Sequence, residues 1–410
     1  MQSLELFTGG GGLALGTHYA GFQHLAVVEL DHDACETLRL NSERHAETGI
    51  RWRVIEEDVR RLDYSEFPTD IDLLAAGAPC QPFSLGGKHA GHADRRNLFP
   101  EVFRAVRELH PRAFLLENVK GLVRESFRPY FEYIIESLMF PHIVRSPDEG
   151  WEEHKARLTR YRKALKAGGT SPWSLPPELC YDVAFKVLDV ADFGAPQRRH
   201  RVFIVGFRRD LGARWSFPEP THSQDALLYA QYVDGSYWEE HGLEPRPVPD
   251  RLAKRVAALA AKPKPLDQRW RTVRDAISDL PAPINYDPTP PLDNHVGIPG
   301  ARAYKGHTGS PWDWPAKTIK AGDHGNPGGE NMLRDDDDSV RYFTVRELAR
   351  LQTFPDSWHF AGSRTESRRQ LGNAVPVAMA ETLGRLIRDE LARVASRTRR
   401  APASAMLAAG

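Results

Sequence analysis

The sequence predicts an α/β protein with a doubly wound parallel sheet and a second, smaller domain inserted in the chain. Apolar runs short enough for buried strands recur in the first half, and helical spacing (i, i+3, i+4, i+7) recurs between them, as in Phe99 to Val106 and Phe131 to Leu138. Alternating strands and helices predict βαβ units. The expected strands span Leu4 to Phe7, Leu25 to Glu29, Ile71 to Ala76, Ala113 to Glu117 and Val202 to Phe207.

The amino-acid composition differs between about Phe217 and Asp338 from that of the rest of the chain. Pro, Gly, Trp and charged residues are frequent there and periodicity is weak, which is typical of a separate, loop-rich domain. Beyond it an amphipathic helix is expected from Met379 to Leu391. A chain of 410 residues exceeds one typical domain, so two units are expected.

Composition restricts the function only broadly. Lys plus Arg and Asp plus Glu both number 55, so net charge carries no nucleic-acid signal, and hydrophobic residues at 41% suit a globular core. No apolar run reaches the roughly 20 residues that a membrane span needs. Cys35, Cys80 and Cys180 lie far apart without a CxxC or Cys/His cluster, so we expect neither disulfides nor a metal site, and a cytoplasmic location.

A glycine cluster follows the first expected strand, in FTGGGG, where missing side chains let a ligand approach the backbone. The run Gly9 to Gly12 does not match GxGxxG, which favours a nucleoside without phosphates over a dinucleotide. Glu29 ends the second strand, ~20 residues on, where a carboxylate can bind ribose hydroxyls. Asp58 is expected beside the adenine. A tight turn without a ligand is the alternative.

Three chemically useful groups come next to expected strands. Cys80, in GAPCQPFS, follows the strand Ile71 to Ala76, and Glu117 ends the next strand in LLENVKGL. If these strands are neighbours, a nucleophile and an acid share one crevice. The segment QRRHR supplies cations, and strand alternation points Arg199 and Arg201 to the same side. A buried inert cysteine and a surface basic cluster are the alternatives.

Six segments in chain order resemble the motifs of the cytosine-5 DNA methyltransferases, of the bacterial restriction-modification type. They are FTGGGG, GAPCQPFS, ENVKGL, QRRHR, RYFTVRELARLQTFPDSW and QLGNAVPVAMAETL. The resemblance implies a Rossmann-like methyltransferase sheet that uses S-adenosylmethionine. Residues 1–216 then form the first part of the catalytic and cofactor-binding domain, 217–338 the target-recognition domain, 339–395 the returning catalytic part and 396–410 a disordered tail.

The resemblance also implies a mechanism. The thiolate of Cys80 adds to C6 of the target cytosine, Glu117 holds its N3 and N4 edge, and Arg201 together with Arg199 holds O2 and a nearby phosphate. Because the reacting atoms lie inside the duplex, the base is flipped out. A hinged lid is expected from Leu85 to Asn97. The substrate and lid residues are Gln81, Ser84, Lys88 and Arg95.

The methyl donor implied by the resemblance is S-adenosylmethionine, without a metal. Phe7 and Leu98 are expected at its adenine, Glu29 at its ribose and Asn373 in the pocket lining. The remaining cofactor-binding residues are Gly9, Gly11, Gly12 and Asp58. One departure concerns the stretch 141–179, which is longer than the family's usual linker and has no assigned role.

The expected partner is double-stranded DNA, bound by a monomer. A cognate restriction endonuclease would act on the same site without direct contact. A tRNA cytosine-5 methyltransferase is the nearest rival, but its Cys-Phe-Thr signature is absent and the recognition region is long. A catalytically inactive DNA-binding relative is the second rival, and the presence of Cys80, Glu117 and Arg201 argues against it.

Overall fold

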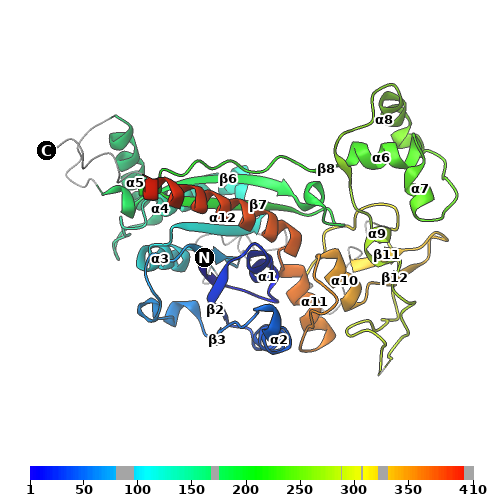
Figure 1. Cartoon of the computed structure of the whole chain (residues 1–410), viewed down its shortest axis with the longest axis horizontal. Coiled ribbons are helices and arrows are strands. Elements are labelled where there is room, and N and C mark those ends of the chain that lie inside the picture. Colours follow the sequence, from blue (N-terminus) through cyan, green and yellow to red (C-terminus); the bar gives the residue numbers. More distant parts are fainter. Residues whose placement is uncertain (80–96, 168–174, 288, 306–307, 322–330, 401–410) are drawn as a thin grey trace. The chain divides into compact units, whose positions relative to one another are not determined.

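The structure is a computed structural model that describes residues 1–79, 97–167, 175–287, 289–305, 308–321 and 331–400 (Figure 1). The chain divides into two compact units. Unit 1 comprises Met1–Leu188, His200–Phe217 and Ala380–Gly410, and unit 2 comprises Asp189–Arg199 and Pro218–Met379.

Unit 1 is built on a seven-stranded sheet of order β3-β2-β1-β4-β5-β7-β6, and this confirms the predicted fold class. Along the part of the sheet with the order β3-β2-β1-β4-β5, each strand pairs in parallel with its neighbours. The expected strands all form, whereas β3 and β6 were not predicted. The strands are β1 (Gln2–Leu6), β2 (Gln23–Glu29), β3 (Val54–Glu56), β4 (Leu73–Ala76), β5 (Ala113–Val119), β6 (Tyr181–Asp189) and β7 (His200–Arg208).

One strand departs from the expected parallel sheet. β7 pairs antiparallel with β5, with Arg201 opposite Val119 and Phe207 opposite Ala113. Only the segment Val190–Arg199 separates β6 from β7, and this is shorter than the dozen or so residues that a parallel crossover needs. Because β7 runs antiparallel to β5, the first residues of β7 lie at the edge of the sheet where β4 and β5 end.

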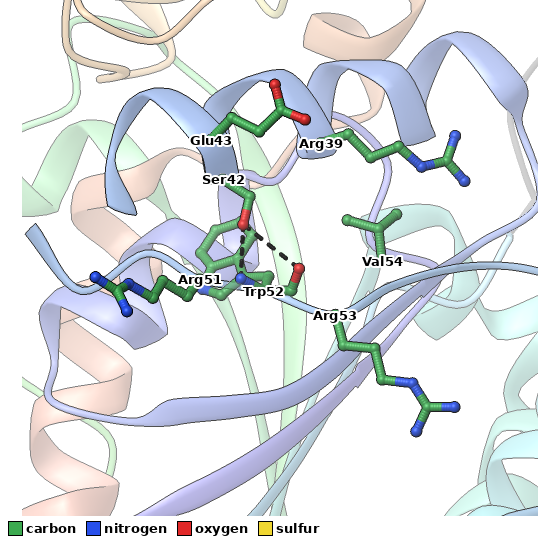
Figure 2. Close-up of a pocket in the computed structure, with 7 residues that line it drawn as sticks. All are labelled: Arg39, Ser42, Glu43, Arg51, Trp52, Arg53 and Val54. Atoms are coloured by element: carbon green, nitrogen blue, oxygen red, sulfur yellow. Dashed lines mark hydrogen bonds between the residues drawn. The ribbon is translucent and has the colours of Figure 1, made fainter. Parts of the chain in front are cut away.

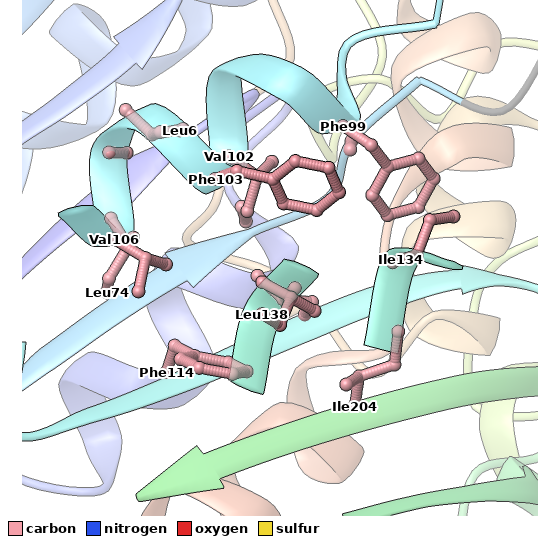
Figure 3. Packing of buried hydrophobic residues seen from close by; sticks show 14 of the residues in the cluster. Leu6, Leu74, Phe99, Val102, Phe103, Val106, Phe114, Ile134, Leu138 and Ile204 are labelled. Carbon is pink, nitrogen blue, oxygen red and sulfur yellow. The ribbon is translucent and has the colours of Figure 1, made fainter. Parts of the chain in front are cut away.

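The core of unit 1 forms where α3 and α4 pack on the sheet (Figure 3). The helical spacing read from the sequence places the apolar residues of both helices on their buried faces. The labelled core residues include Phe99, Val102, Phe103 and Val106 of α3, Ile134 and Leu138 of α4, and Leu74, Phe114 and Ile204 of the sheet.

Another contact in unit 1 joins the end of the chain to its beginning. On α12, Gly384 is close-packed against α1, since a Cβ there would lie 2.8 Å from Ala20 Cβ, and Arg388 Nη1 donates to Ala20 O at 2.8 Å. The helices with residues in unit 1 are α1 (Gly12–Tyr19), α2 (His32–Arg44), α3 (Phe99–Leu109), α4 (Arg128–Met139), α5 (Trp151–Lys166) and α12 (Val377–Arg400).

Unit 2 consists of short elements joined by long loops. Trp238 and Trp270 are buried in one of its cores, and Leu228 in another. Its helices are α6 (Gln224–Tyr232), α7 (Ser236–Glu240), α8 (Asp250–Ala260), α9 (Val273–Ile277), α10 (Val345–Leu351) and α11 (Arg364–Asn373). Its short strands are β8 (His222–Ser223), β9 (Gln268–Arg269), β10 (Ser310–Pro311), β11 (Met332–Arg334) and β12 (Val340–Tyr342).

The division into units differs from the expected domain boundaries at one main point. Unit 2 begins its long segment at Pro218, next to the expected boundary, but it also contains residues 339–379, which were expected to return to the catalytic part. The cause is that α10 packs against α9 and α11. The last segment of unit 1 begins at Ala380. Within the described ranges, no helix has the length and apolar character to cross a membrane.

A close contact between β5 and β7 provides a test of this topology. Gly206 lies opposite the fully buried Phe114, and a Cβ on Gly206 would lie 2.1 Å from Phe114 Cζ. Because overpacking a core costs about 1–3 kcal/mol, we expect Gly206→Ala to lower the free energy of unfolding by about that amount in urea denaturation. Adding Phe114→Leu should reduce the penalty; fully additive losses would contradict the β5–β7 register.

Candidate active site

The glycine loop turns sharply between β1 and α1. Its backbone enters the left-handed region at Phe7 (φ 58°), Gly9 (φ 56°) and Gly11 (φ 91°), and α1 begins at Gly12. A Cβ placed on Gly9 would meet nothing within 4 Å. The positive φ favours glycine at position 9, and the space around its Cα is open to a ligand.

The carboxylate of Glu29 holds this loop in place. Its Oε2 accepts a hydrogen bond from Gly9 N at 2.7 Å, and its Oε1 accepts from Leu30 N at 2.8 Å and Asp31 N at 2.9 Å. Glu29 ends β2, and the loop follows β1, its parallel neighbour. The structure thus brings the predicted ribose-binding carboxylate directly onto the predicted cofactor loop.

The remaining predicted cofactor residues of unit 1 have local structural roles. Asp58 accepts from Arg60 N at 3.0 Å and pairs with the Arg60 guanidinium at 2.5 Å, and this hydrogen-bonded pairing lowers the pKa of Asp58. Leu98 is the N-cap residue of α3 and packs against the core. Neither contact tests the predicted proximity to adenine.

The sheet edge brings an acid and a cation together. Arg201 Nε lies 2.8 Å from Glu117 Oε1, and their side chains are only 13% and 9% exposed. The antiparallel register explains the pair, because Arg201 lies opposite Val119, two residues beyond Glu117 on the same face. A Cβ on Gly77 would lie 4.0 Å from Glu117 Oε2 and 3.7 Å from Phe7 O. The glycine loop, the acid and the segment that leads to the predicted nucleophile therefore meet here.

The segment after β4 is tied to β5 by a buried amide. Asn118, which is 3% exposed, donates from Nδ2 to Ala78 O at 3.1 Å. This bond holds the segment that continues through Pro79 to Cys80. Cys80 itself and the predicted substrate and lid residues lie outside the described residues; these are Gln81, Ser84, Lys88 and Arg95.

Arg199 has a different environment from Arg201. It is fully buried, and its guanidinium donates to Ile319 O at 3.0 Å and to Gly372 O at 2.7 Å, all within unit 2. Arg199 precedes β7, which begins at His200, so strand alternation does not relate it to Arg201. Its contacts are those of an anchor between backbone segments. Asn373, also in unit 2, ends α11 with an exposed side chain.

Sequence reasoning passed over one acidic residue near the loop. Glu5 on β1 is fully buried, and burial raises its pKa well above the usual value. Its signal in the sequence is a carboxylate inside the apolar run LELF, which a simple strand assignment ignores. A buried carboxyl group two residues before Phe7 is thus part of the surroundings of the loop.

The two described cysteines are unsuited to act as nucleophiles. Burial, with a smaller contribution from the nearby Glu29 carboxylate, raises the pKa of the Cys35 thiol to about 12. Burial also raises the pKa of the Cys180 thiol to about 11. The thiolate is the reactive form of cysteine, so both are inert near neutral pH. Of the three cysteines in the chain, Cys80 is the one that these environments do not disqualify.

A cavity of about 450 Å³ lies elsewhere in unit 1 (Figure 2). Arg39, Arg51 and Arg53 surround it, and Ser42 Oγ accepts from Trp52 N at 2.7 Å. Its lining residues on the β3 side come before that strand or at its first residue. Open α/β sheets bind ligands at the opposite, carboxyl ends of their strands, so this cavity is not the candidate site.

One acidic cluster in unit 2 has the composition of a metal site. Glu240, His241 and Asp275 come close together, but Arg269 pairs with Asp275 at 2.7 Å and with Glu240 at 2.8 Å. A guanidinium therefore already neutralises these carboxylates. The cluster forms part of an ion-pair network that supports the short helices α7 and α9.

The seven-stranded sheet and the glycine loop after β1 define a Rossmann-like methyltransferase fold. Residues 1–140 and 177–389 match the family of C-5 cytosine-specific DNA methylases, and the chain belongs to this family. Its activity is accordingly DNA (cytosine-5) methylation, with DNA as the substrate, and the family implies S-adenosylmethionine as methyl donor. The match omits residues 141–176, which include α5, in agreement with the unusual length expected there.

Curated relatives resemble the chain along most of its length. It is 32% identical over 389 residues to the Type II methyltransferase M.NgoMIV of Neisseria gonorrhoeae, covering 94% of this chain and 96% of that one. M.PspPI of a Psychrobacter species is 32% identical over 391 residues, covering 94% and 78%. A solved structure of a Spodoptera frugiperda DNMT2 mutant, 15% identical, has a TM-score of 0.54 and covers 94% and 99%, which shows the shared fold alone.

The cysteine environments predict selective alkylation. At mildly alkaline pH, iodoacetamide should modify Cys80 in the native protein well before Cys35 and Cys180, because thiol reactivity follows the thiolate fraction. Peptide mapping by mass spectrometry reads each site, and a sample unfolded in urea, in which all three react, serves as the control. Rapid modification of Cys35 in the folded protein would contradict this account of its environment.

Proposed function

We propose that the protein methylates C5 of one cytosine within a specific duplex DNA sequence, through a covalent bond between Cys80 and C6 of a flipped-out base. The observation that carries this proposal is the Glu117–Arg201 pair beside Gly77, in the segment that continues to Cys80. A nucleophile, an acid and a cation on one sheet edge suit addition to an electron-poor ring.

Each protein group has a defined role in the proposed reaction. The Cys80 thiolate forms a bond to C6, and the displaced electron pair makes C5 nucleophilic while Glu117, in its protonated form, donates its proton to N3 and takes it back when the aromatic ring is restored. Arg201 keeps Glu117 oriented and donates to the cytosine O2. After the new C5–CH₃ bond has formed, the C5 proton leaves to a base, the C6–S bond breaks and the ring regains its aromaticity.

S-adenosylmethionine, when bound, supplies an electrophilic methyl group. The open space above Gly9 and the Glu29 carboxylate at the loop fit a nucleoside with free ribose hydroxyls. No metal is required. The residues proposed to hold the cofactor are Phe7, Gly9, Gly11, Gly12, Glu29, Asp58, Leu98 and Asn373.

The biological setting proposed is restriction-modification, because the two curated relatives above are named Type II methyltransferases. Residues 217–338 would select the sequence, and Gln81, Ser84, Lys88 and Arg95 would contact the substrate or close over it. Extrusion of the target base is needed because C5 and C6 lie inside the duplex stack. The enzyme would act as a monomer, and a cognate endonuclease would recognise the same site without touching it.

Bisulfite sequencing of DNA from bacterial cells that express the protein tests the proposed function. We expect complete methylation of one short sequence motif and none in cells that express Cys80→Ser, with Cys35→Ser as the matched cysteine control that retains activity. A methyl-transfer assay on duplex DNA and on tRNA then separates the nearest rival. An unmethylated genome, or transfer to tRNA alone, would overturn the proposal.

A further inference from the structure

Gln352 lies at a junction of backbone segments in unit 2. It follows α10 and is fully buried, and its Nε2 donates to Leu371 O and, at 3.3 Å, to Ala374 O. Its own carbonyl accepts from Val377 N at 3.1 Å. One glutamine thus contacts the backbone on both sides of Asn373, a proposed cofactor residue.

A second buried glutamine sets the orientation of the first. Gln197 accepts from Ile319 N at 3.0 Å through Oε1, and this directs its Nε2 toward Gln352 Oε1, at 3.0 Å. Because an amide has a donor end and an acceptor end, Gln352 must then direct its own Nε2 toward the carbonyls of Leu371 and Ala374. Two amides in series therefore fix the direction of the contact.

The residue between these carbonyls is held as well. Gly372 O accepts from Arg199 Nη2 at 2.7 Å, and Arg199 Nη1 donates to Ile319 O at 3.0 Å. A Cβ on Gly372 would lie 2.2 Å from Ala321 N, so only glycine permits this close approach. Buried donors thus restrain the carbonyls of Leu371, Gly372 and Ala374, whereas the side chain of Asn373 is exposed.

These contacts have two consequences for α11. The last carbonyls of a helix lack intrahelical partners, and Gln352 and Arg199 supply donors to them. A buried network in which the donors and acceptors match also restricts the backbone to one arrangement. The turn that carries Asn373 is thereby held by contacts within unit 2.

We propose that Gln352 is a positioning residue for cofactor binding: together with Gln197 and Arg199, it holds the turn that presents Asn373 to S-adenosylmethionine. The inference rests on the proposed contact between Asn373 and the cofactor. Under this proposal Arg199 supports the backbone of unit 2, in place of the substrate role expected from the sequence.

The test compares two buried glutamines of unit 2. Gln352→Met removes the amide while preserving volume, and Gln231→Met is the matched control, since Gln231 is 1% exposed and donates to Asp313 O at 2.7 Å, away from α11. We expect Gln352→Met to raise the dissociation constant of S-adenosylmethionine, measured by calorimetry, about tenfold, which is ~1.4 kcal/mol. The control should leave it within about twofold even where both variants lose similar thermal stability.

A double-mutant cycle with Asn373→Ala separates positioning from general stability. In the Asn373→Ala background, Gln352→Met should cause no further weakening, because the group that it positions is already gone. If Gln352→Met does not fold, Gln197→Met, which removes only the orienting donor, should weaken binding in the same direction and also lose its effect in that background.

Three results are distinguishable. An unchanged dissociation constant in folded Gln352→Met and Gln197→Met overturns the positioning role, as does a full effect that persists in the Asn373→Ala background. Unchanged binding in Asn373→Ala alone overturns the proposed cofactor contact of Asn373, and the inference falls with it.

Discussion

The ion pair between Glu117 and Arg201 is the interaction on which the rest of the site depends. It exists because β7 runs antiparallel to β5, so that the start of β7 meets the end of β5. Charges this poorly exposed are stable only when paired. The pair therefore places an acid with its orienting cation beside Gly77, on the way to Cys80, and the proposed chemistry depends on that placement.

A second constraint links the pair to the cofactor loop. Glu29 ends β2 and holds Gly9, while Phe7 O, on the same loop, lies close to the Cβ position of Gly77. Within unit 1, hydrogen bonds thus join the ends of β1 and β2 and, through Asn118 Nδ2 and Ala78 O, the ends of β4 and β5, while the ends of β1 and β4 pack closely. This arrangement is compatible with the proposed methyl-donor and base sites at the carboxyl edge of one sheet.

The sequence predicted the strands with strong apolar runs, the helices with clear periodicity and the position of Glu29 at the end of the second strand, but not its hydrogen bond to Gly9. Two strands were not predicted from the sequence. β3 has only three residues, and β6 has no continuous apolar run and leaves Phe185 48% exposed. Local patterns carry no information on strand direction, so the antiparallel β7 was not foreseen. They also carry no information on long-range burial, so the burial of Arg199 among the carbonyls of Ile319 and Gly372 was not foreseen.

We propose that Glu117 and Arg201 act as one unit in methyl transfer. Single-turnover rate constants on duplex DNA for Glu117→Gln, Arg201→Gln and the double variant test it most directly, with S-adenosylmethionine saturating. Residues that act as a unit show strongly non-additive losses, so the double variant should be little slower than the slower single variant. Losses that multiply in the double variant would show independent roles and contradict the account.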